Sequence, residues 1–389
     1  MSAAAAIVGI GQTEYSRGSG RDEWSLAVEA IQCALDDCGL APDDIDGLAH
    51  FSYDAVDEAM LVRTFGWHLR WYSQTAYGGL GAPAVLAHAA AAVASGAARA
   101  VICYRSLNGY SGTRYGRAER SVGAGCGDAL ARGDRAPSGA FAGPYGLLSP
   151  GQVMALWARR YQWDAGITED ELCTALARVA VDQRAYAQRN PAAVMRDRPL
   201  DEAAYRAARM ISTPLRVYDL ALETDGAVAV VVAAADVARA LDAAPVWIAA
   251  STAGLFPYAE SISVYGEPRN GPQYRAVADR LYAAAGIAPN DLAAAMIYDA
   301  TSVSVLLGME GYGLAPVGEA WREVTEKGIG PDTRVPVNTS GGHLSEAYVH
   351  GLNLVVEGVR QCRGTSANQV ARSGPVLISS GPGAVVVTP

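Results

Sequence analysis

NTSGGHLSEAYVHG, residues 338 to 351, is the stretch that decides how the whole chain is interpreted. Gly341 and Gly342 at one end and Gly351 at the other frame a turn, and Tyr348 lies inside it with a histidine on either side. Glycine at such positions permits backbone conformations that are closed to other residues. The pattern predicts a glycine-framed turn that leads from a strand into a helix, with a tyrosine held inside the turn.

Strand-like and helix-like segments alternate on both sides of a long middle region. AAAAIVGIGQT indicates a buried strand, and DEWSLAVEAIQCALDDCGL indicates a helix that stops at Gly39. The same alternation starts again after about Ala243 and runs to the closing strand pair PVLISSGPGAVVVTP. We therefore predict an α/β fold with two similar halves, residues 1–242 and 243–389. The first half is expected to contain an inserted loop region at about 107–214.

The composition limits the class of protein. The chain has 389 residues, of which 50% are hydrophobic and 18% are charged, so it can bury a large interior. Its net charge of −9 argues against nucleic acid as a partner, because phosphate binding needs a basic surface. There is no run of about 20 apolar residues and no basic flank at the N-terminus. These observations predict a cytoplasmic protein that does not insert into a membrane.

Several common reaction chemistries lack their residues. Lys327 is the only lysine, and its surroundings indicate a solvated helix end rather than a buried Schiff-base site. The six cysteines and five histidines show no metal-binding spacing beyond the loose pair His343 and His350. Gly9 and Gly11 begin the spacing of a dinucleotide-binding turn, but no third glycine follows. We therefore expect neither a resident metal nor a resident cofactor.

Four segments resemble the four signatures of the thiolase superfamily in the right order, over essentially the full chain. The glycine frame is intact while every protonic group has changed. Gly78, in GGLGAPA, stands in the place of the nucleophilic cysteine, and Tyr298-Asp299-Ala300 fills the slot of the Asn-Glu or His-Asp pair. Tyr348 falls on the histidine of NxxGGxxxxGHPxG. Ser379, Gly381 and Gly383 occupy the CxGxG motif.

This resemblance implies a thiolase fold of duplicated, layered α-β-α-β-α halves, but not thiolysis, which needs the missing thiolate. Backbone N–H groups at Gly78 and Gly381, with Ser379 beside them, are expected to form the oxyanion hole for a thioester enolate. The chain most resembles the sterol-carrier-like aldolases that cleave the side chain of steroid CoA thioesters. Their reaction converts a 17-hydroxy C22 steroid CoA to a 17-oxo steroid and propionyl-CoA. In that role Tyr348 and Tyr298 divide the work of base and acid.

The resemblance also implies partners. It implies an OB-fold, zinc-ribbon protein that helps to bind the steroid acyl-CoA, and any zinc is expected there. It implies a homodimer that pairs through the strand and turn near Gln74 to Gly79.

Roles around the two tyrosines are left open by the sequence. A phenol is a poor base at neutral pH unless a neighbour lowers its pKa, and His343 and His350 are the nearby candidates. Asp299 is a candidate to orient a donor or a water. Two other functions remain: a non-catalytic acyl-CoA or lipid-binding protein and, with less support, a divergent acyltransferase. The other three histidines, His50, His68 and His88, are expected to be structural.

Overall fold

The structure is a computed structural model, and it describes residues 4–52, 54–75, 81–112, 114, 145–147, 149–253, 271–380 and 383–389. Two of the expected oxyanion-hole residues, Gly78 and Gly381, lie outside this part of the chain. The same is true of residues 76–79, which form most of the segment expected at a dimer interface. The predictions for these residues are therefore untested.

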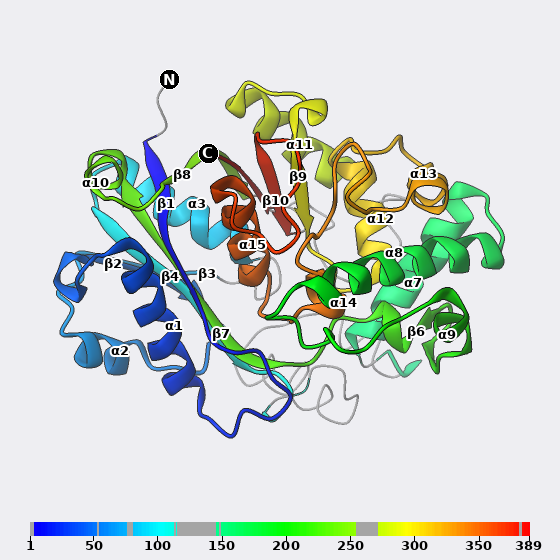
Figure 1. Cartoon of the computed structure of the whole chain (residues 1–389), viewed down its shortest axis with the longest axis horizontal. Coiled ribbons are helices and arrows are strands. Elements are labelled where there is room, and N and C mark those ends of the chain that lie inside the picture. Colours follow the sequence, from blue (N-terminus) through cyan, green and yellow to red (C-terminus); the bar gives the residue numbers. More distant parts are fainter. Residues whose placement is uncertain are drawn as a thin grey trace.

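A nine-stranded mixed sheet runs through the molecule in the order β3-β2-β4-β7-β1-β8-β11-β10-β9 (Figure 1). The strands of the first half are β1 (Ala5–Gln12), β2 (Gly47–Phe51), β3 (Trp71–Thr75), β4 (Ala100–Asn108) and β7 (Asp225–Ala234). Those of the second half are β8 (Val246–Ala253), β9 (Ala294–Ile297), β10 (Val376–Ser380) and β11 (Gly383–Thr388). The two groups meet where β1 pairs antiparallel with β8, at Ala6 with Trp247 and Ile7 with Val246.

The two halves repeat one topology. In each half the first strand pairs antiparallel with the last (β1 with β7, β8 with β11), and the last pairs antiparallel with the preceding strand of the nine-stranded sheet (β7 with β4, β11 with β10). That strand in turn lies parallel to the second strand of its half. A third strand, β3, extends the first half in parallel, and in the second half a single parallel bridge between Ala295 and Val337 takes its place. The duplicated fold is thus confirmed, although the two halves share no visible sequence repeat.

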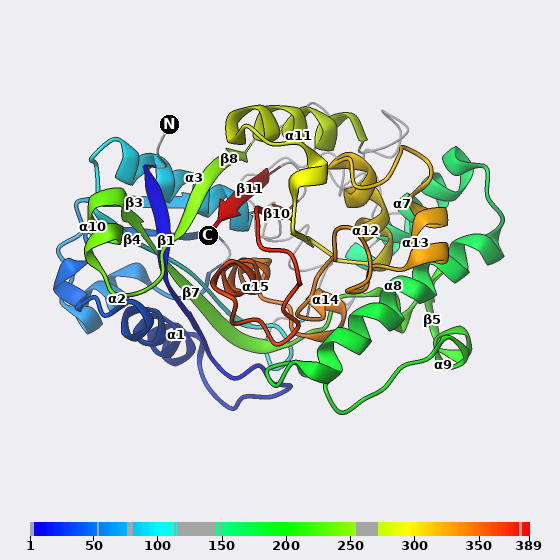
Figure 2. The same cartoon turned by 45° about the horizontal axis from the view of Figure 1, so that its top comes forward.

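Alternating side chains divide the core into layers. Ile7 faces the centre of the molecule and Val8 the outside, and β7 alternates in the same way. Between the two halves lie α3 (Gly81–Ala94) and α15 (Leu352–Arg363), and Figures 1 and 2 show α15 enclosed by strands of both halves. The outer faces are covered by α1 (Glu23–Cys38) on the first half and by α11 (Gly271–Ala285) and α12 (Ser302–Gly311) on the second.

Gly9 and Gly11 are explained by the packing of α1 on β1. A Cβ atom at Gly9 would lie 2.2 Å from the carbonyl oxygen of Ala34, and one at Gly11 would lie 2.1 Å from that of Ala30. These glycines therefore let the helix approach the strand backbone directly. The helix itself is capped by Asp22, whose side chain accepts from the N–H of Ser25.

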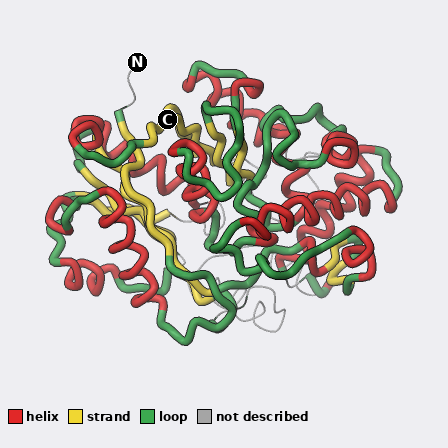
Figure 3. Tube along the Cα trace, viewed as in Figure 1, coloured by secondary structure: helices red, strands yellow, loops and turns green. Residues whose placement is uncertain are grey.

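The insertion between β4 and β7 is mainly helical from residue 149 onward, as Figure 3 shows by its red segments. Its elements are α7 (Pro150–Ala165), α8 (Glu169–Arg189), α9 (Glu202–Ala207), β5 (Met210–Ser212) and β6 (Leu215–Arg216). The expectation of an inserted loop region at about 107–214 did not anticipate α8 and α9. The buried side of α8 is rich in alanine, so its helical period carries a weak hydrophobic signal.

The remaining helices are short, and α14 precedes the turn that contains Tyr348. They are α2 (Glu58–Phe65), α10 (Ala235–Ala240), α13 (Ala320–Lys327) and α14 (Gly342–Ser345). Within the described ranges, no helix is long and apolar enough to cross a membrane.

Candidate active site

Two tyrosine hydroxyls meet at the centre of the candidate site. Tyr298 follows β9, Tyr348 lies between α14 and α15, and their hydroxyl oxygens are 2.7 Å apart. The rings meet nearly edge to face, with centroids 6.2 Å apart. Both side chains are half-buried. The structure therefore brings together two phenols that are 50 residues apart in the sequence.

Tyr298 is positioned by the backbone around it. Asn338 accepts the N–H of Ile297 at 2.7 Å and donates to the carbonyl of the same residue at 2.9 Å, as a neighbouring strand would. The backbone N–H of Tyr298 donates to the carbonyl of Ser379 on β10 at 3.1 Å. The side chain thus starts from a fixed strand end. Asn338, the first residue of the NTSGG frame, thus fixes the backbone before Tyr298, a role that the motif alone did not reveal.

Tyr348 is positioned by Thr224, the residue before β7. Its N–H donates to the Thr224 hydroxyl at 3.0 Å, and that hydroxyl donates back to the Tyr348 carbonyl at 3.2 Å. Thr224 is fully buried. The first half of the chain therefore fixes a candidate catalytic residue that belongs to the second half.

Asp299 and His343 contact each other beside the two phenols. Asp299 Oδ2 accepts the backbone N–H of His343 at 2.9 Å, at the start of α14. The imidazole Nδ1 lies 3.0 Å from Asp299 Oδ1, although at an angle that makes no hydrogen bond. The His343 ring stands 4.8 Å from that of Tyr298 and 5.1 Å from that of Tyr348, centroid to centroid. Asp299 thus holds His343 in place beside the phenols.

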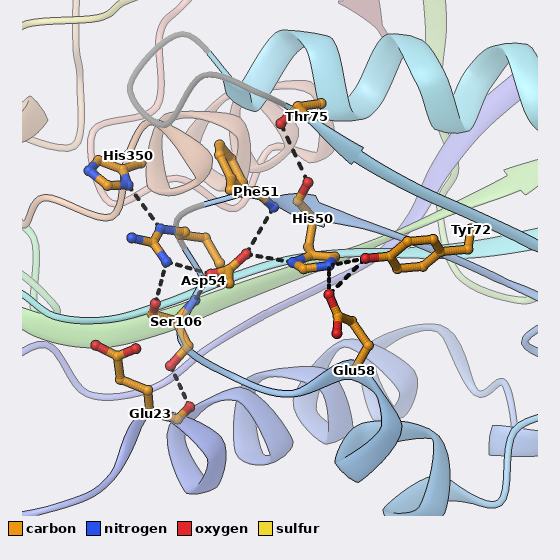
Figure 4. A network of polar contacts seen from close by, with 10 residues as sticks. Glu23, His50, Phe51, Asp54, Glu58, Tyr72, Thr75, Ser106 and His350 are labelled. Atoms are coloured by element: carbon orange, nitrogen blue, oxygen red, sulfur yellow. Dashed lines mark hydrogen bonds and ion pairs between the residues drawn. The ribbon is translucent and has the colours of Figure 1, made fainter. Parts of the chain in front are cut away.

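His350 lies on the other side of Tyr348. Its ring is perpendicular to that of Tyr348 with centroids 5.0 Å apart, and Arg105 Nε donates to its Nδ1 at 2.8 Å. Figure 4 shows this contact at the edge of a larger polar network. Burial, then the charge of Arg105 and the nearby His343, hold the pKa of His350 well below its usual range. His350 is therefore a neutral imidazole at neutral pH.

The surroundings of Tyr298 suit it to keep its proton. Burial, followed by the charge on Tyr348 and the hydrogen bond with it, raises the pKa of Tyr298 well above its ordinary value. Tyr298 therefore keeps its proton, as a hydrogen-bond donor or a general acid must.

The five candidate catalytic residues, Tyr348, Tyr298, Asp299, His343 and His350, are close together. Ser379 is buried at the end of β10, and its hydroxyl forms a hydrogen bond that offsets part of the burial effect on the pKa of Tyr312. Among the described residues no set of three His, Cys, Asp or Glu side chains is arranged to hold a metal.

Sequence reasoning missed four contributors to the site: Arg105, Thr224, Asn338 and Asn353. Arg105 had a usable signal, because it is a charged residue inside the apolar strand AVICYRSLN, and a buried charge requires a partner. Asn353 had none. It contacts His343 Nε2 through its side-chain oxygen at 3.2 Å and donates to Glu346 at 3.0 Å, and neither contact follows from a spacing rule.

Glu346, which Asn353 connects to the site, gives a pH-dependent prediction. Burial, with a further contribution from Glu357, raises its pKa to about 7 against the hydrogen bonds from Asn353 and Ser340. Between about pH 4.5 and 7 the folded chain binds this proton more strongly than the unfolded chain does. This group therefore makes stability fall as pH rises through that window, by up to about 3 kcal/mol.

Glu346→Gln removes the titration and hence this part of the slope. Denaturant unfolding of both proteins at pH 5 and pH 7.5 measures it. The wild type is expected to lose more stability between the two values than the variant does. Parallel losses in the two proteins would place the pKa of Glu346 outside this window.

Three comparisons with known proteins agree with the resemblance of the motifs. Residues 268–387 match the family described as Thiolase C-terminal domain-like. The chain is 39% identical over 386 residues to the 17-hydroxy-3-oxo-4-pregnene-20-carboxyl-CoA lyase of Mycobacterium tuberculosis, covering 98% of this chain and 97% of that one. It is 38% identical over 383 residues to a steroid side-chain-cleaving aldolase of Thermomonospora curvata, covering 98% and 95%.

The solved structure of an Ltp2-ChsH2(DUF35) aldolase matches with a TM-score of 0.90 at 36% identity, covering 99% of this chain and 98% of that one. This identity over nearly the whole of both chains shows more than a shared fold. The chain belongs to the family of steroid side-chain-cleaving aldolases, a branch of the thiolase superfamily.

Proposed function

We propose that the chain is a retro-aldolase that cleaves a β-hydroxy steroid CoA thioester, a 17-hydroxy C22 steroid CoA, into a 17-oxo steroid and propionyl-CoA. The observation that carries this proposal is the contact of 2.7 Å between the hydroxyls of Tyr298 and Tyr348, where a thiolase would have its activating histidine and its polar pair. The activities named for the two relatives give the substrate class.

The reaction balances with the protein's own groups. Tyr348, as the phenolate, takes the proton of the β-hydroxyl, and the electrons of that O–H bond form the ketone. The bond to the α-carbon of the thioester breaks, and its electron pair becomes the thioester enolate. A phenol then returns a proton to the α-carbon, which gives propionyl-CoA. No oxidant or second substrate is consumed.

The geometry favours one division of roles in this proposal. Tyr298 has the raised pKa and keeps its proton, so it donates to the oxygen of Tyr348 and stabilises the phenolate there. His343, held by Asp299, supports both rings from one side, and His350 supports Tyr348 from the other. The backbone N–H groups of Gly78 and Gly381, with Ser379 beside them, are proposed to bind the enolate oxygen.

The direct test is to incubate the protein with a 17-hydroxy C22 steroid CoA and to quantify both products by mass spectrometry. A retro-aldolase gives 17-oxo steroid and propionyl-CoA in equal amounts and releases no free CoA. Thioester binding without turnover would identify an acyl-CoA-binding protein instead. Free CoA, or an acyl group moved to an added acceptor, would identify an acyltransferase.

The assembly is a second part of the proposal. We propose a homodimer that pairs near Gln74 to Gly79 and a second protein of the OB-fold, zinc-ribbon class, supported by the name of the matching solved structure, which pairs an aldolase with a DUF35 protein. Neither a resident metal nor a resident cofactor is proposed for this chain, and any zinc would belong to the partner. The cytoplasmic location expected from the sequence stays a prediction.

The partner is expected to raise turnover rather than only solubility, because it helps to bind the acyl-CoA. Light scattering coupled to gel filtration gives the mass of the chain alone and of the mixture, and the product assay is run on both. A dimer of the chain and a larger complex with higher kcat/KM are expected. A monomer at micromolar concentration would overturn the dimer, and full activity of the chain alone would overturn the need for a partner.

A further inference from the structure

A line of polar and charged side chains, most of them buried, runs from the candidate site to the edge of the first-half sheet (Figure 4). We call it the charge chain. Its members are, from the site outward, His350, Arg105, Asp54, His50 and Glu58 with Tyr72. The side chains of Arg105, Asp54 and His50 have no exposed surface, whereas that of Glu58 is 37% exposed. Charged side chains are costly to bury unless each is paired with an opposite charge. The alternation of basic and acidic groups along the charge chain therefore requires an explanation.

The proton on His350 can be placed at one atom. An arginine Nε always carries hydrogen and only donates, so the Nδ1 atom that it contacts at 2.8 Å must be an acceptor. The imidazole is then neutral and carries its single proton on Nε2. Protonating Nδ1 would break this hydrogen bond and place a second positive charge against the guanidinium.

Arg105 is itself fixed from two directions. Its Nη1 donates to Asp54 Oδ1 and to the carbonyl of Ser106. The carboxylate of Asp54 also accepts the backbone N–H of Phe51 at 2.9 Å and lies 3.0 Å from His50 Nδ1. The guanidinium therefore has one available position, which determines where its Nε hydrogen is directed.

At the outer end of the charge chain His50 lies between the carboxyl groups of Asp54 and Glu58. Tyr72 gives its only hydroxyl hydrogen to Glu58 Oε1, at 2.7 Å, while His50 Nε2 lies 2.9 Å from the hydroxyl oxygen and 3.0 Å from Oε1. Although desolvation raises the pKa of Glu58, hydrogen bonds, chiefly from Tyr72, outweigh it and lower that pKa on balance. Glu58 is therefore a carboxylate, and the proton between it and His50 belongs to Nε2. His50 Nδ1 faces a second carboxylate, that of Asp54, so the ring lies between two acidic side chains.

We propose that Arg105, held in place by Asp54, which His50 contacts in turn, is a positioning residue that fixes His350 as a neutral imidazole with its proton on Nε2 beside Tyr348. This rests on the proposed aldolase function for its catalytic meaning. A neutral N–H donor stabilises developing charge on an oxygen without losing its proton, whereas an imidazolium would protonate that oxygen. The group that the Nε2 hydrogen of His350 stabilises is therefore an oxyanion of the steroid thioester or the phenolate of Tyr348.

Few titratable groups surround His350 in the described part of the chain. Arg105 faces it from β4, His343 from α14, and Tyr348 precedes it, with Tyr298 hydrogen-bonded to Tyr348. The contact from β2 is Phe51, which does not titrate.

Nuclear magnetic resonance on the wild-type protein tests the placement of the proton directly. The chain has five histidines, so ¹⁵N-histidine labelling gives few ring signals, and the signals absent from His350→Gln identify His350. We expect a protonated Nε2 and an unprotonated Nδ1, unchanged between about pH 5.5 and 8, because a group of ordinary pKa titrates in that range. A protonated Nδ1, or titration of His350 in this window, would overturn the proposal.

Arg105→Gln tests the positioning role by its effect on pH dependence. Burial still lowers the His350 pKa in this variant, but loss of the arginine charge should raise that pKa, so kcat/KM should acquire an ionisation on the acidic side of neutral pH that the wild type lacks. A residue with only a structural role would lower the rate equally at every pH, and that result would contradict the proposal. Arg105→Lys keeps the charge but not the forked geometry, so it should restore only part of the wild-type profile.

Controls separate folding from positioning. Arg99→Gln is the matched control, since Arg99 precedes the same strand and makes an exposed ion pair with Asp236. It should leave the pH profile unchanged. Because Arg105→Gln strands the Asp54 carboxylate, the double variant Arg105→Gln, Asp54→Asn is made as well, and both are checked by circular dichroism. If neither folds, the resonance experiment on the wild type still decides.

The two proposals fail in different ways. If the protein shows the fixed, neutral His350 signal but does not cleave the thioester, the proposal for the charge chain stands and the aldolase function fails. If the protein has full cleavage activity and His350 titrates freely, the aldolase function stands and the positioning role of Arg105 fails.

Discussion

Tyr348→Phe is expected to lower kcat by about 10² to 10⁴, the range that a general acid or base typically contributes. The substitution removes only the phenolic oxygen, so the contacts of the ring with His343 and His350 remain. Backbone hydrogen bonds with Thr224 are also unaffected. Tyr298→Phe should cost a comparable or smaller amount, because it removes the donor to Tyr348 rather than the base itself.

The measurement is the rate of ketone release by each variant at saturating substrate. Tyr282→Phe is a suitable control, since its hydroxyl donates to the carbonyl of Tyr312 in the core of the second half, at 2.8 Å. It should lose stability of about 1 kcal/mol and no activity. If both active-site variants keep near wild-type rates while binding the thioester, the tyrosines are packing residues and the binding-protein alternative gains support.

Gly342→Ala is expected to reduce stability by about 2 to 5 kcal/mol, the sum of a left-handed backbone and an overpacked side chain. Gly342 has φ +57°, and a Cβ atom there would lie 2.3 Å from Asp299 Oδ2. That oxygen holds the backbone N–H groups at the start of α14. The carboxylate must therefore move, and His343 moves with it, so kcat should fall together with stability.

Gly364→Ala separates the two contributions. Gly364 ends α15 with φ +73°, but a Cβ atom there would meet nothing within 4 Å. It should therefore cost only the backbone part, about 1 kcal/mol, and leave kcat unchanged. Thermal unfolding and the product assay on both variants give the comparison. Equal losses of stability would show that Asp299 yields to the methyl group without cost.

The sequence identified the residues of the site whose place is set by the glycine frame. Tyr348 was found because it occupies a slot in a turn whose glycines are kept, and Tyr298 because Tyr298-Asp299-Ala300 fills the slot of another thiolase signature. The alternation of strands and helices likewise predicted the duplicated fold, since each half builds its own strand order from local segments.

The contacts that could not be predicted join segments far apart in the chain. Arg105 and His350 are 245 residues apart, and only the pairing of β4 in the completed sheet aims one at the other. His50 was expected to be structural because no local pattern connects it to Asp54, Arg105 and the site. The role of Gly9 and Gly11 was invisible for the same reason, because it depends on where α1 packs.

The position of β8 between β1 and β11 has a consequence for the order of the two halves. Trp247 pairs with Ala6 on one side and with Thr388 on the other. Only β8 therefore separates β1, the first strand, from β11, the last. Two strand spacings amount to about 10 Å, a gap that a few residues can bridge. A circularly permuted chain that starts at β8, runs through β11 and continues into β1 would exchange the halves and keep every strand pair. The linear order of the two halves is therefore separable from the architecture that sets the phenol pair.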